Sequence, residues 1–200
     1  MTAVAETTID FARARRAMID SQLRVSGVNA DWVLAAMDRV PREDHVPPAA
    51  RAHAYIDRAI PLGDGHALAA PLVYGLLLSE AAPGPQDKAL LVSGGSTYLE
   101  ALLRPLVGSL DVISAADAAA LAKGAGQHSL VVIDGAIEHL PDGLAAELAE
   151  GGRIVTGLVE RGVTRLATGQ KLAGAVTLLP LADVGIPVLG EFAAPKGWSF

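Results

Sequence analysis

Residues 89–106, ALLVSGGSTYLEALLRPL, decide the fold of this chain. The apolar run Ala89–Val92 has the length of a buried strand, and the turn that follows it, Ser93–Thr97, contains two adjacent glycines. Helical periodicity follows over Leu99–Leu106. A strand, a glycine turn and a helix in this order are typical of the first unit of a parallel α/β sheet.

The same alternation continues toward the C-terminus. Strand-length apolar runs are expected at Leu110–Ile113, Leu130–Ile133 and Ile154–Leu158, with a helix at Leu140–Leu148. Because strands alternate with helices, the pattern predicts right-handed crossovers and a parallel sheet.

Two further features set the limits of this sheet. Val163–Thr168 and Ala175–Pro180 predict an antiparallel hairpin that turns at Thr168–Lys171 and finishes the sheet. Residues 114–129 separate the second expected strand from the third, and a parallel crossover uses about a dozen residues or more. This interval therefore has room for one helix and for no further strand.

The region before the sheet is predicted to be helical. Periodic apolar residues predict a helix from Thr8 to Val25, closed by Gly27, and a second helix that Asn29 caps and Pro41 ends. The segments that follow are a short helix, an ordered loop and a longer helix, at Ala49–Tyr55, Pro61–Pro71 and Leu72–Ala82.

Composition limits the function classes. The chain has 200 residues, no Cys and a formal net charge of -6, so disulfides, thiolate metal sites and a cysteine nucleophile are excluded. Aromatic residues make up 4%, and this scarcity together with the acidic charge argues against a nucleic-acid partner. The histidines show no metal-ligand spacing, so no metal is expected. The apolar runs fall short of the roughly 20 residues that span a membrane, so we expect a cytoplasmic protein with no membrane partner.

Doubly wound sheets bind ligands at the carboxyl ends of strands, near the point where the strand order reverses. The candidate cofactor-binding residues are therefore Ser93, Gly94, Gly95, Ser96, Asp134 and Gly135. The turn is not G-x-G-x-x-G, and a plain strand-to-helix turn is an equal interpretation. Asp134 is expected to end the third strand, where its carboxylate would contact the ligand, and an N-cap of the following helix is the equal alternative for this side chain. The second strand is followed by Ser114–Ala116, which offers no carboxylate for a ribose. Asp117 could substitute only if the strand ends late, and a helix N-cap is the alternative role for it.

Several motifs resemble the protein-L-isoaspartate O-methyltransferase family, and the ending is similar to that of a divergent bacterial branch. These motifs are RAMIDSQLR at 16–24, VLAAM at 33–37, VPRE at 40–43, IDGA at 133–136, EGGR at 150–153 and PVLGEF at 187–192. The resemblance implies a Rossmann-like α/β fold with a mostly parallel sheet, a C-terminal antiparallel hairpin and an N-terminal helical extension. It also implies S-adenosylmethionine as cofactor and isoaspartyl carboxylates in damaged proteins or peptides as methyl acceptors.

The resemblance also divides the chain. Residues 1–82 correspond to the N-terminal helical region and substrate-loop segment, packed on the Rossmann-like core of residues 83–200 as one structural unit. The candidate residues of the substrate loop are Asp64, His66 and Pro71. The family's hydroxyl positions in this loop are Ala67 and Ala69 here, so no catalytic residue is assigned.

Departures from the family pattern predict a degenerate cofactor site. The family's acidic residue and glycines map onto Leu91, Ser93, Gly95 and Thr97, so the acidic position and two glycines are lost. The interval 114–129 lacks the family's edge strand and its contacts to adenine. Methyl transfer to a carboxylate remains feasible, because this group is ionised at neutral pH and needs no general base. The alternative is a catalytically inactive relative that kept the fold as a binding or interaction module.

Overall fold

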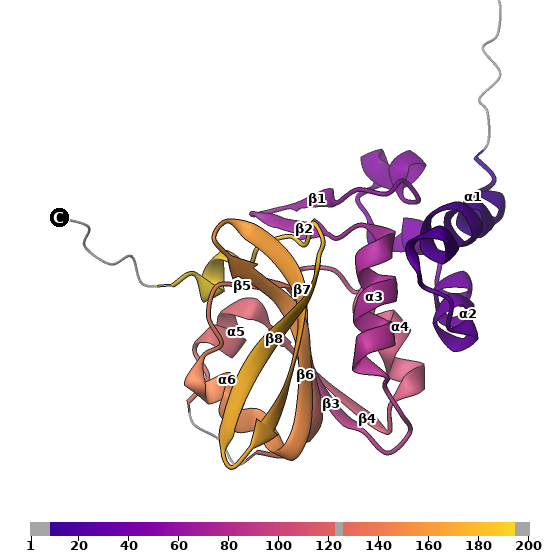
Figure 1. The fold of residues 1–200 in the computed structure, drawn as a ribbon. Coiled ribbons are helices and arrows are strands. Elements are labelled where there is room, and N and C mark those ends of the chain that lie inside the picture. The colour runs from indigo at the N-terminus through magenta and orange to yellow at the C-terminus, as the bar shows by residue number, and fades with distance from the viewer. Residues whose placement is uncertain (1–8, 123–125, 195–200) are drawn as a thin grey trace, which may run out of the picture.

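The computed structural model describes residues 9–122 and 126–194. The described residues form a six-stranded sheet with helices on both faces, and a separate two-stranded hairpin (Figure 1). The helices are α1 (Phe11–Met18), α2 (Asp31–Arg39), α3 (Pro71–Ala81), α4 (Tyr98–Leu103), α5 (Ala115–Ala119) and α6 (Asp142–Glu147). The strands are β1 (Ile60–Gly63), β2 (His66–Leu68), β3 (Lys88–Ser93), β4 (Ser109–Ser114), β5 (His128–Ile137), β6 (Leu148–Glu160), β7 (Val163–Leu172) and β8 (Ala175–Asp183).

The order of strands in the main sheet is β4-β3-β5-β6-β7-β8. The first four of these are parallel, and β7 and β8 are antiparallel to their neighbours. The chain leaves β3 for β4 on one side and returns to the other side of β3 as β5. The reversal point of the topology therefore lies between the carboxyl ends of β3 and β5, as in other doubly wound sheets.

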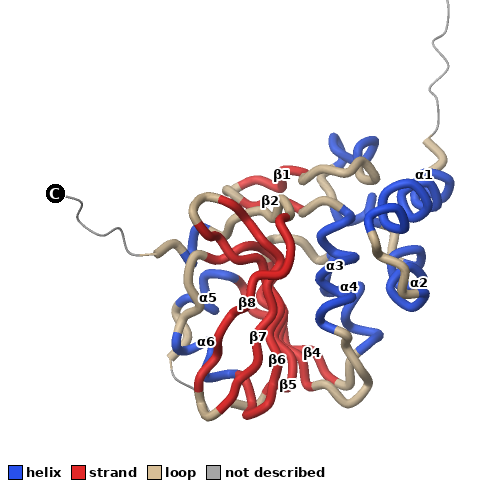
Figure 2. Tube along the Cα trace, in the orientation of Figure 1, coloured by secondary structure: helices blue, strands red, loops and turns tan. Residues whose placement is uncertain are grey.

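Successive residues of the strands point to opposite faces of the sheet, and each face is buried by a different group of helices. Leu91 and Val132 pack with the N-terminal region, α3 and α4, whereas Leu90 and Val131 pack with α5 and α6. Figure 2 shows the red sheet between these two groups of blue helices. The predicted α/β sheet with a C-terminal antiparallel hairpin and an N-terminal helical extension is confirmed.

The N-terminal helices differ in detail from the prediction. The first continues past α1 through a π-helical turn and a 3₁₀ turn to Gly27, which has a left-handed φ of 91° and closes it as predicted. The Asn29 cap is wrong, because Ala30 precedes α2 and no side chain caps the helix. The helix predicted at Ala49–Tyr55 is a 3₁₀ helix, Pro48–His53.

Two further predictions, one of a loop and one of a hairpin turn, differ from the structure. The segment expected to be a loop, Pro61–Pro71, contains most of the β1–β2 hairpin, whose strands are too short for a visible alternation. The β7–β8 hairpin turns at Ala173 and Gly174, which have φ of 50° and 81°, and not at residues 168–171. Two consecutive positive φ values give the tight turn that matches the twist of paired strands.

The sheet ends at β4 on one side. Within residues 9–122 and 126–194, no strand pairs with the outer edge of β4, so the predicted lack of an edge strand is confirmed. The interval that follows β4 holds only α5 in its described part. In the part of the chain that the structure describes, no helix is long and apolar enough to cross a membrane.

Candidate active site

The turn between β3 and α4 holds its own hydroxyls in internal hydrogen bonds. Gly95 has a φ of 96°, which favours glycine, and its N–H donates to Ser93 Oγ over 3.2 Å. The Ser93 hydroxyl donates to the carbonyl oxygen of Ser96 over 3.4 Å. Ser96 is buried, and its Oγ accepts from the N–H of Tyr98 over 3.1 Å. The two hydroxyls therefore fix the shape of the turn.

Strand β5 lies in direct contact with this turn. A Cβ at Gly94 would lie 1.9 Å from the carbonyl oxygen of Asp134, so the approach depends on residue 94 having no side chain. The Leu189 side chain crowds Gly135 in the same way, with Cγ 2.5 Å from a Cβ at that position. The structure thus brings together the two groups of predicted cofactor residues, the turn and Asp134–Gly135.

The Asp134 side chain is buried, and its Oδ2 has no hydrogen-bond partner among the residues that the structure describes. Burial raises the pKa of Asp134 to about 7, although the Tyr74 hydroxyl and the Arg42 guanidinium act to lower it. Two expectations for Asp134 are wrong: β5 does not end there but continues to Ile137, and Pro141, not Asp134, precedes α6. The strand runs past its one carboxylate because the backbone continues to pair with β6.

A buried arginine belongs to the same cluster. Arg42 is fully buried, its Nε donates to the carbonyl oxygen of Ala54 over 2.7 Å, and its Nη2 donates to that of Ala69. Its guanidinium carbon lies 5.4 Å from the ring centre of Tyr74 and 5.1 Å from that of Tyr98. Arg42 Nη1 and the Tyr98 hydroxyl have no hydrogen-bond partner. Burial lowers the pKa of Arg42 from its usual value.

Sequence reasoning did not select Arg42 as a site residue. Its neighbours come from distant parts of the chain, and no local pattern connects them. The only available signal was the motif VPRE at residues 40–43, which contributed to the family resemblance.

The β1–β2 hairpin carries the predicted substrate-loop residues. His66 lies against the glycine turn, because its Cβ would be 2.9 Å from a Cβ at Gly95. Asp64 occupies the exposed turn of the hairpin with a φ of 51°. Pro71 begins α3, and Ala69 is buried just before it. Of the three predicted loop residues, His66 is therefore the one that the structure places beside the glycine turn.

A cleft of about 490 Å³ opens beside this hairpin. It is lined by Asp64, Gly65, His66, Val188, Gly190 and Glu191. Within this cleft, His66 Nε2 lies 3.6 Å from Glu191 Oε1. The alanines at 67 and 69 supply no side-chain hydrogen bond to this region.

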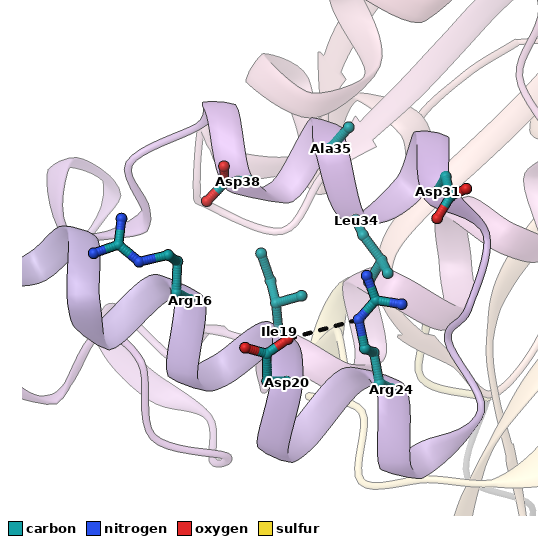
Figure 3. A pocket seen from close by; sticks show the side chains of 8 residues that line it. All are labelled: Arg16, Ile19, Asp20, Arg24, Asp31, Leu34, Ala35 and Asp38. Atoms are coloured by element: carbon teal, nitrogen blue, oxygen red, sulfur yellow. Dashed lines mark ion pairs between the residues drawn. The ribbon is translucent and has the colours of Figure 1, made fainter.

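A second groove lies between the first two helices and away from the glycine turn. It measures about 340 Å³. Figure 3 shows side chains from both helices pointing toward it, with Arg24 Nε 3.6 Å from Asp20 Oδ1 at one end. The predicted cofactor and substrate-loop residues take no part in its lining.

No cluster of three or more potential metal ligands was found among the described residues. His128 contacts two carboxylates, but Asp111 lies 3.0 Å from Nε2 and Glu147 lies 3.3 Å from Nδ1. Because the two carboxylates lie on opposite ring nitrogens, they cannot share one ion with this histidine.

These contacts indicate which ligand groups the carboxyl ends of β3 and β5 could bind. Asp134 presents an unpartnered carboxylate oxygen beside a backbone turn, which suits a positively charged group of a ligand. The neighbouring cleft is open to a larger molecule, and it carries both an acidic and an imidazole side chain.

Comparison with known proteins agrees with this architecture. Residues 13–131 match the sequence model of the family described as protein-L-isoaspartate(D-aspartate) O-methyltransferase. A protein-L-isoaspartate O-methyltransferase of Roseiflexus castenholzii is 30% identical over 210 residues, covering 92% of this chain and 96% of the relative. The enzyme of the same name from Koribacter versatilis is 31% identical over 206 residues, covering 90% and 93%.

Solved structures show the same fold. One is a Plasmodium falciparum protein of this type in complex with S-adenosyl-L-homocysteine, with a TM-score of 0.71 and 18% identity over 88% of this chain and 98% of that one. Another protein-L-isoaspartate O-methyltransferase has a TM-score of 0.67 and 15% identity, covering 88% of this chain and 66% of that one. The family match and the full-length relatives lead to one conclusion: the chain belongs to the protein-L-isoaspartate O-methyltransferase family.

Proposed function

We propose that this protein transfers a methyl group from S-adenosylmethionine to the carboxylate of L-isoaspartyl residues in damaged proteins. Family membership supports the reaction type. The observation that carries the proposal is that three segments of the chain meet at the carboxyl ends of β3 and β5. The glycine turn, Asp134 and the β1–β2 hairpin are far apart in sequence, and His66 and the Asp134 carbonyl both lie against the turn.

The residues present fit the methyl donor. This molecule carries a positive sulfonium and an ammonium group, and Asp134 offers a buried carboxylate oxygen without a partner. With a pKa of about 7, this carboxyl is partly ionised at neutral pH, and a nearby cation favours the ionised form. The residues that would hold the donor are Ser93, Gly94, Gly95, Ser96, Asp134 and Gly135.

The chemistry asks little of the protein beyond alignment. The donor supplies an electrophilic methyl group, and the acceptor carboxylate is ionised at neutral pH, so no general base is required. The work of the chain is to orient the acceptor and to exclude water from it. Asp64 and His66 line the cleft through which a peptide would reach the glycine turn. Because residues 67 and 69 are alanines, the substrate loop offers the acceptor no side-chain hydroxyl at these positions. Separately, we propose that the altered glycine turn, Ser93–Thr97, binds the donor weakly.

An assay with matched peptides tests the proposal. We expect the protein to transfer labelled methyl groups to an isoaspartyl peptide and not to the same peptide with a normal aspartyl linkage. We also expect S-adenosylmethionine at about 100 times its Kd to stabilise the fold by roughly 2.7 kcal/mol in thermal unfolding. Asp134→Asn should weaken donor binding by about tenfold, which corresponds to about 1.4 kcal/mol. Asp20→Asn, which changes an exposed carboxylate in the groove of the first two helices, serves as the matched control.

Three outcomes separate the alternatives. Methyl transfer to both peptides would contradict the isoaspartyl substrate. Donor binding without transfer to either peptide would favour a relative that kept the fold as a binding module. No stabilisation at millimolar donor, together with no transfer, would contradict the proposed function.

A further inference from the structure

The C-terminal segment Pro187–Phe192, which we call the strap, lies beside the carboxyl end of β5. The N–H of Ala136 donates to the carbonyl oxygen of Pro187 over 2.8 Å, and the N–H of Leu189 donates to that of Ala136 over 2.9 Å. These bonds make a parallel bridge between Ala136 and Val188. A short length of the strap therefore runs as an additional strand beside β5.

The side of β5 that the strap occupies follows from the pairing register. Gly157 of β6 pairs with Ala136 on one side of β5. Strand β3 occupies the other side, and its last pair with β5 joins Val92 to Ile133. Val188 therefore takes the position beyond the end of β3. This position is the crevice at the reversal point of the sheet, where doubly wound folds bind their ligands.

Side chains complete the closure of this crevice. Leu189 is buried against Gly135, and its Cγ would lie 2.5 Å from a Cβ there. Glu191 Oε1 lies 3.6 Å from Nε2 of His66, whose Cβ in turn contacts the glycine turn. The strap and the β1–β2 hairpin thus meet at His66, beside the glycine turn.

The strap is anchored on both sides of the residues that pair with β5. Just before the strap, the N–H of Ile186 donates to Thr164 Oγ1 over 3.1 Å. Phe192 is fully buried, and its carbonyl oxygen accepts from the N–H of Glu138 over 3.3 Å and from His139 Nδ1 over 3.0 Å. Between these anchors, the two backbone bonds to Ala136 and the contact of Glu191 with His66 hold the segment down.

We propose that the strap gates the crevice, so that S-adenosylmethionine enters only when Val188 and Leu189 leave β5. This inference rests on the proposed function. The methyl donor and the strap compete for one position, because both require the space beyond β3 and beside β5. The apparent affinity for the donor is then the intrinsic affinity multiplied by the fraction of molecules in which the strap is open.

A reversible disulfide tests the gate. Ala136→Cys with Val188→Cys joins a bridged pair, and neighbouring strands lie about 4.8 Å apart, within the Cα range of a disulfide. The natural chain has no Cys, so no other thiol competes. Thr168→Cys with Leu179→Cys is the matched control, because these residues pair on β7 and β8, away from the crevice. S-adenosylmethionine binding is measured by calorimetry for each variant, oxidised and reduced.

We expect the oxidised Ala136–Val188 variant to bind S-adenosylmethionine at least about tenfold more weakly than its reduced form. The control should bind equally in both forms. Equal affinity of the oxidised and reduced Ala136–Val188 variant, with binding intact, would overturn the gate and leave the proposed function standing. No binding by the wild type or by any reduced variant would overturn the proposed function and the gate with it.

Hydrogen exchange provides a second readout in the unmodified protein. If the strap opens for the donor, the Leu189 amide loses its bond to Ala136, so its exchange should accelerate when S-adenosylmethionine is added. Slower exchange at Leu189 would mean that the strap closes over the donor, and it would overturn the proposed competition.

Discussion

The polar groups at the two ends of the parallel sheet differ in how completely they are hydrogen-bonded. At the amino end, Asp87 accepts bonds of 2.7 and 3.0 Å from Arg153, 2.7 Å from Ser129 and 2.8 Å from the N–H of Gly84. Ser129 Oγ also accepts from the N–H of Lys88 over 3.2 Å. Both oxygens of this carboxylate are satisfied, and the cluster joins β3, β5 and β6.

At the carboxyl end, the polar groups remain short of partners. Arg42 Nη1, the Tyr98 hydroxyl and Asp134 Oδ2 are all buried without a hydrogen bond. Burial raises the pKa of Asp134 to about 7, whereas at Asp87 the bonds from Arg153, Ser129 and Gly84 outweigh burial and lower the pKa to about 2. Asp87 is therefore fully partnered at the amino end, whereas Asp134 lacks a partner at the end where we propose that the donor binds.

Among the substitutions that test this contrast, Arg42→Leu has the largest expected effect on stability. The substitution leaves the buried carbonyl oxygens of Ala54 and Ala69 without donors, so we expect a loss of about 3–5 kcal/mol in the free energy of unfolding, measured with urea. Arg39→Leu is the control, because this arginine is exposed and should change stability by less than about 0.5 kcal/mol. A loss below about 1 kcal/mol for Arg42→Leu would show that the cluster tolerates missing donors.

Asp87→Asn tests the satisfied end. We expect a loss of about 2–3 kcal/mol at neutral pH, because the folded pKa of about 2 lies well below the unfolded value of about 3.9. For the wild type, the same stability is present above about pH 4 and is lost as pH falls through 2. Urea unfolding at neutral pH and at about pH 2.5 checks both statements. If the variant loses the same amount at both values, the ion pair is not the cause.

Asp134→Asn tests the unsatisfied end and should have the opposite sign. The folded pKa of about 7 exceeds the unfolded value of about 3.9, so the carboxyl binds its proton more tightly when folded, and wild-type stability falls as pH rises. We expect this group to cost on the order of 2–3 kcal/mol between about pH 5 and about pH 8. The variant should lose less over that range and be the more stable protein at the upper end. Parallel slopes for both proteins would contradict the raised pKa.

The sequence predicted those parts of the fold that local patterns determine. The apolar runs at Leu110–Ile113 and Ile154–Leu158 lie within β4 and β6, and Gly27 closes its helix. The β1–β2 hairpin was missed because its strands are short, and the turn at Ala173 was missed because alanine rarely adopts a positive φ.

The candidate site was less predictable for a different reason. The glycine turn and Asp134 were found because they follow apolar runs, where the topology collects ligand-binding residues. Arg42 and the strap lie near the glycine turn and Asp134 only because of tertiary packing. A periodic pattern in the local sequence cannot predict such contacts. Nothing in the sequence indicated that Tyr74 of α3 and Arg42 of the 3₁₀ helix Arg42–His45 act on the Asp134 carboxyl.

The outer strand β4 also has a consequence for self-association. A sheet that lacks its outermost strand presents unpaired backbone groups, on which another chain could add and start polymerisation. Here that border is only six residues long, and it places Asp111 and two serines around the exposed Val112. A short border with a charge at its centre opposes such growth, so the exposed edge of β4 is a poor template for another chain.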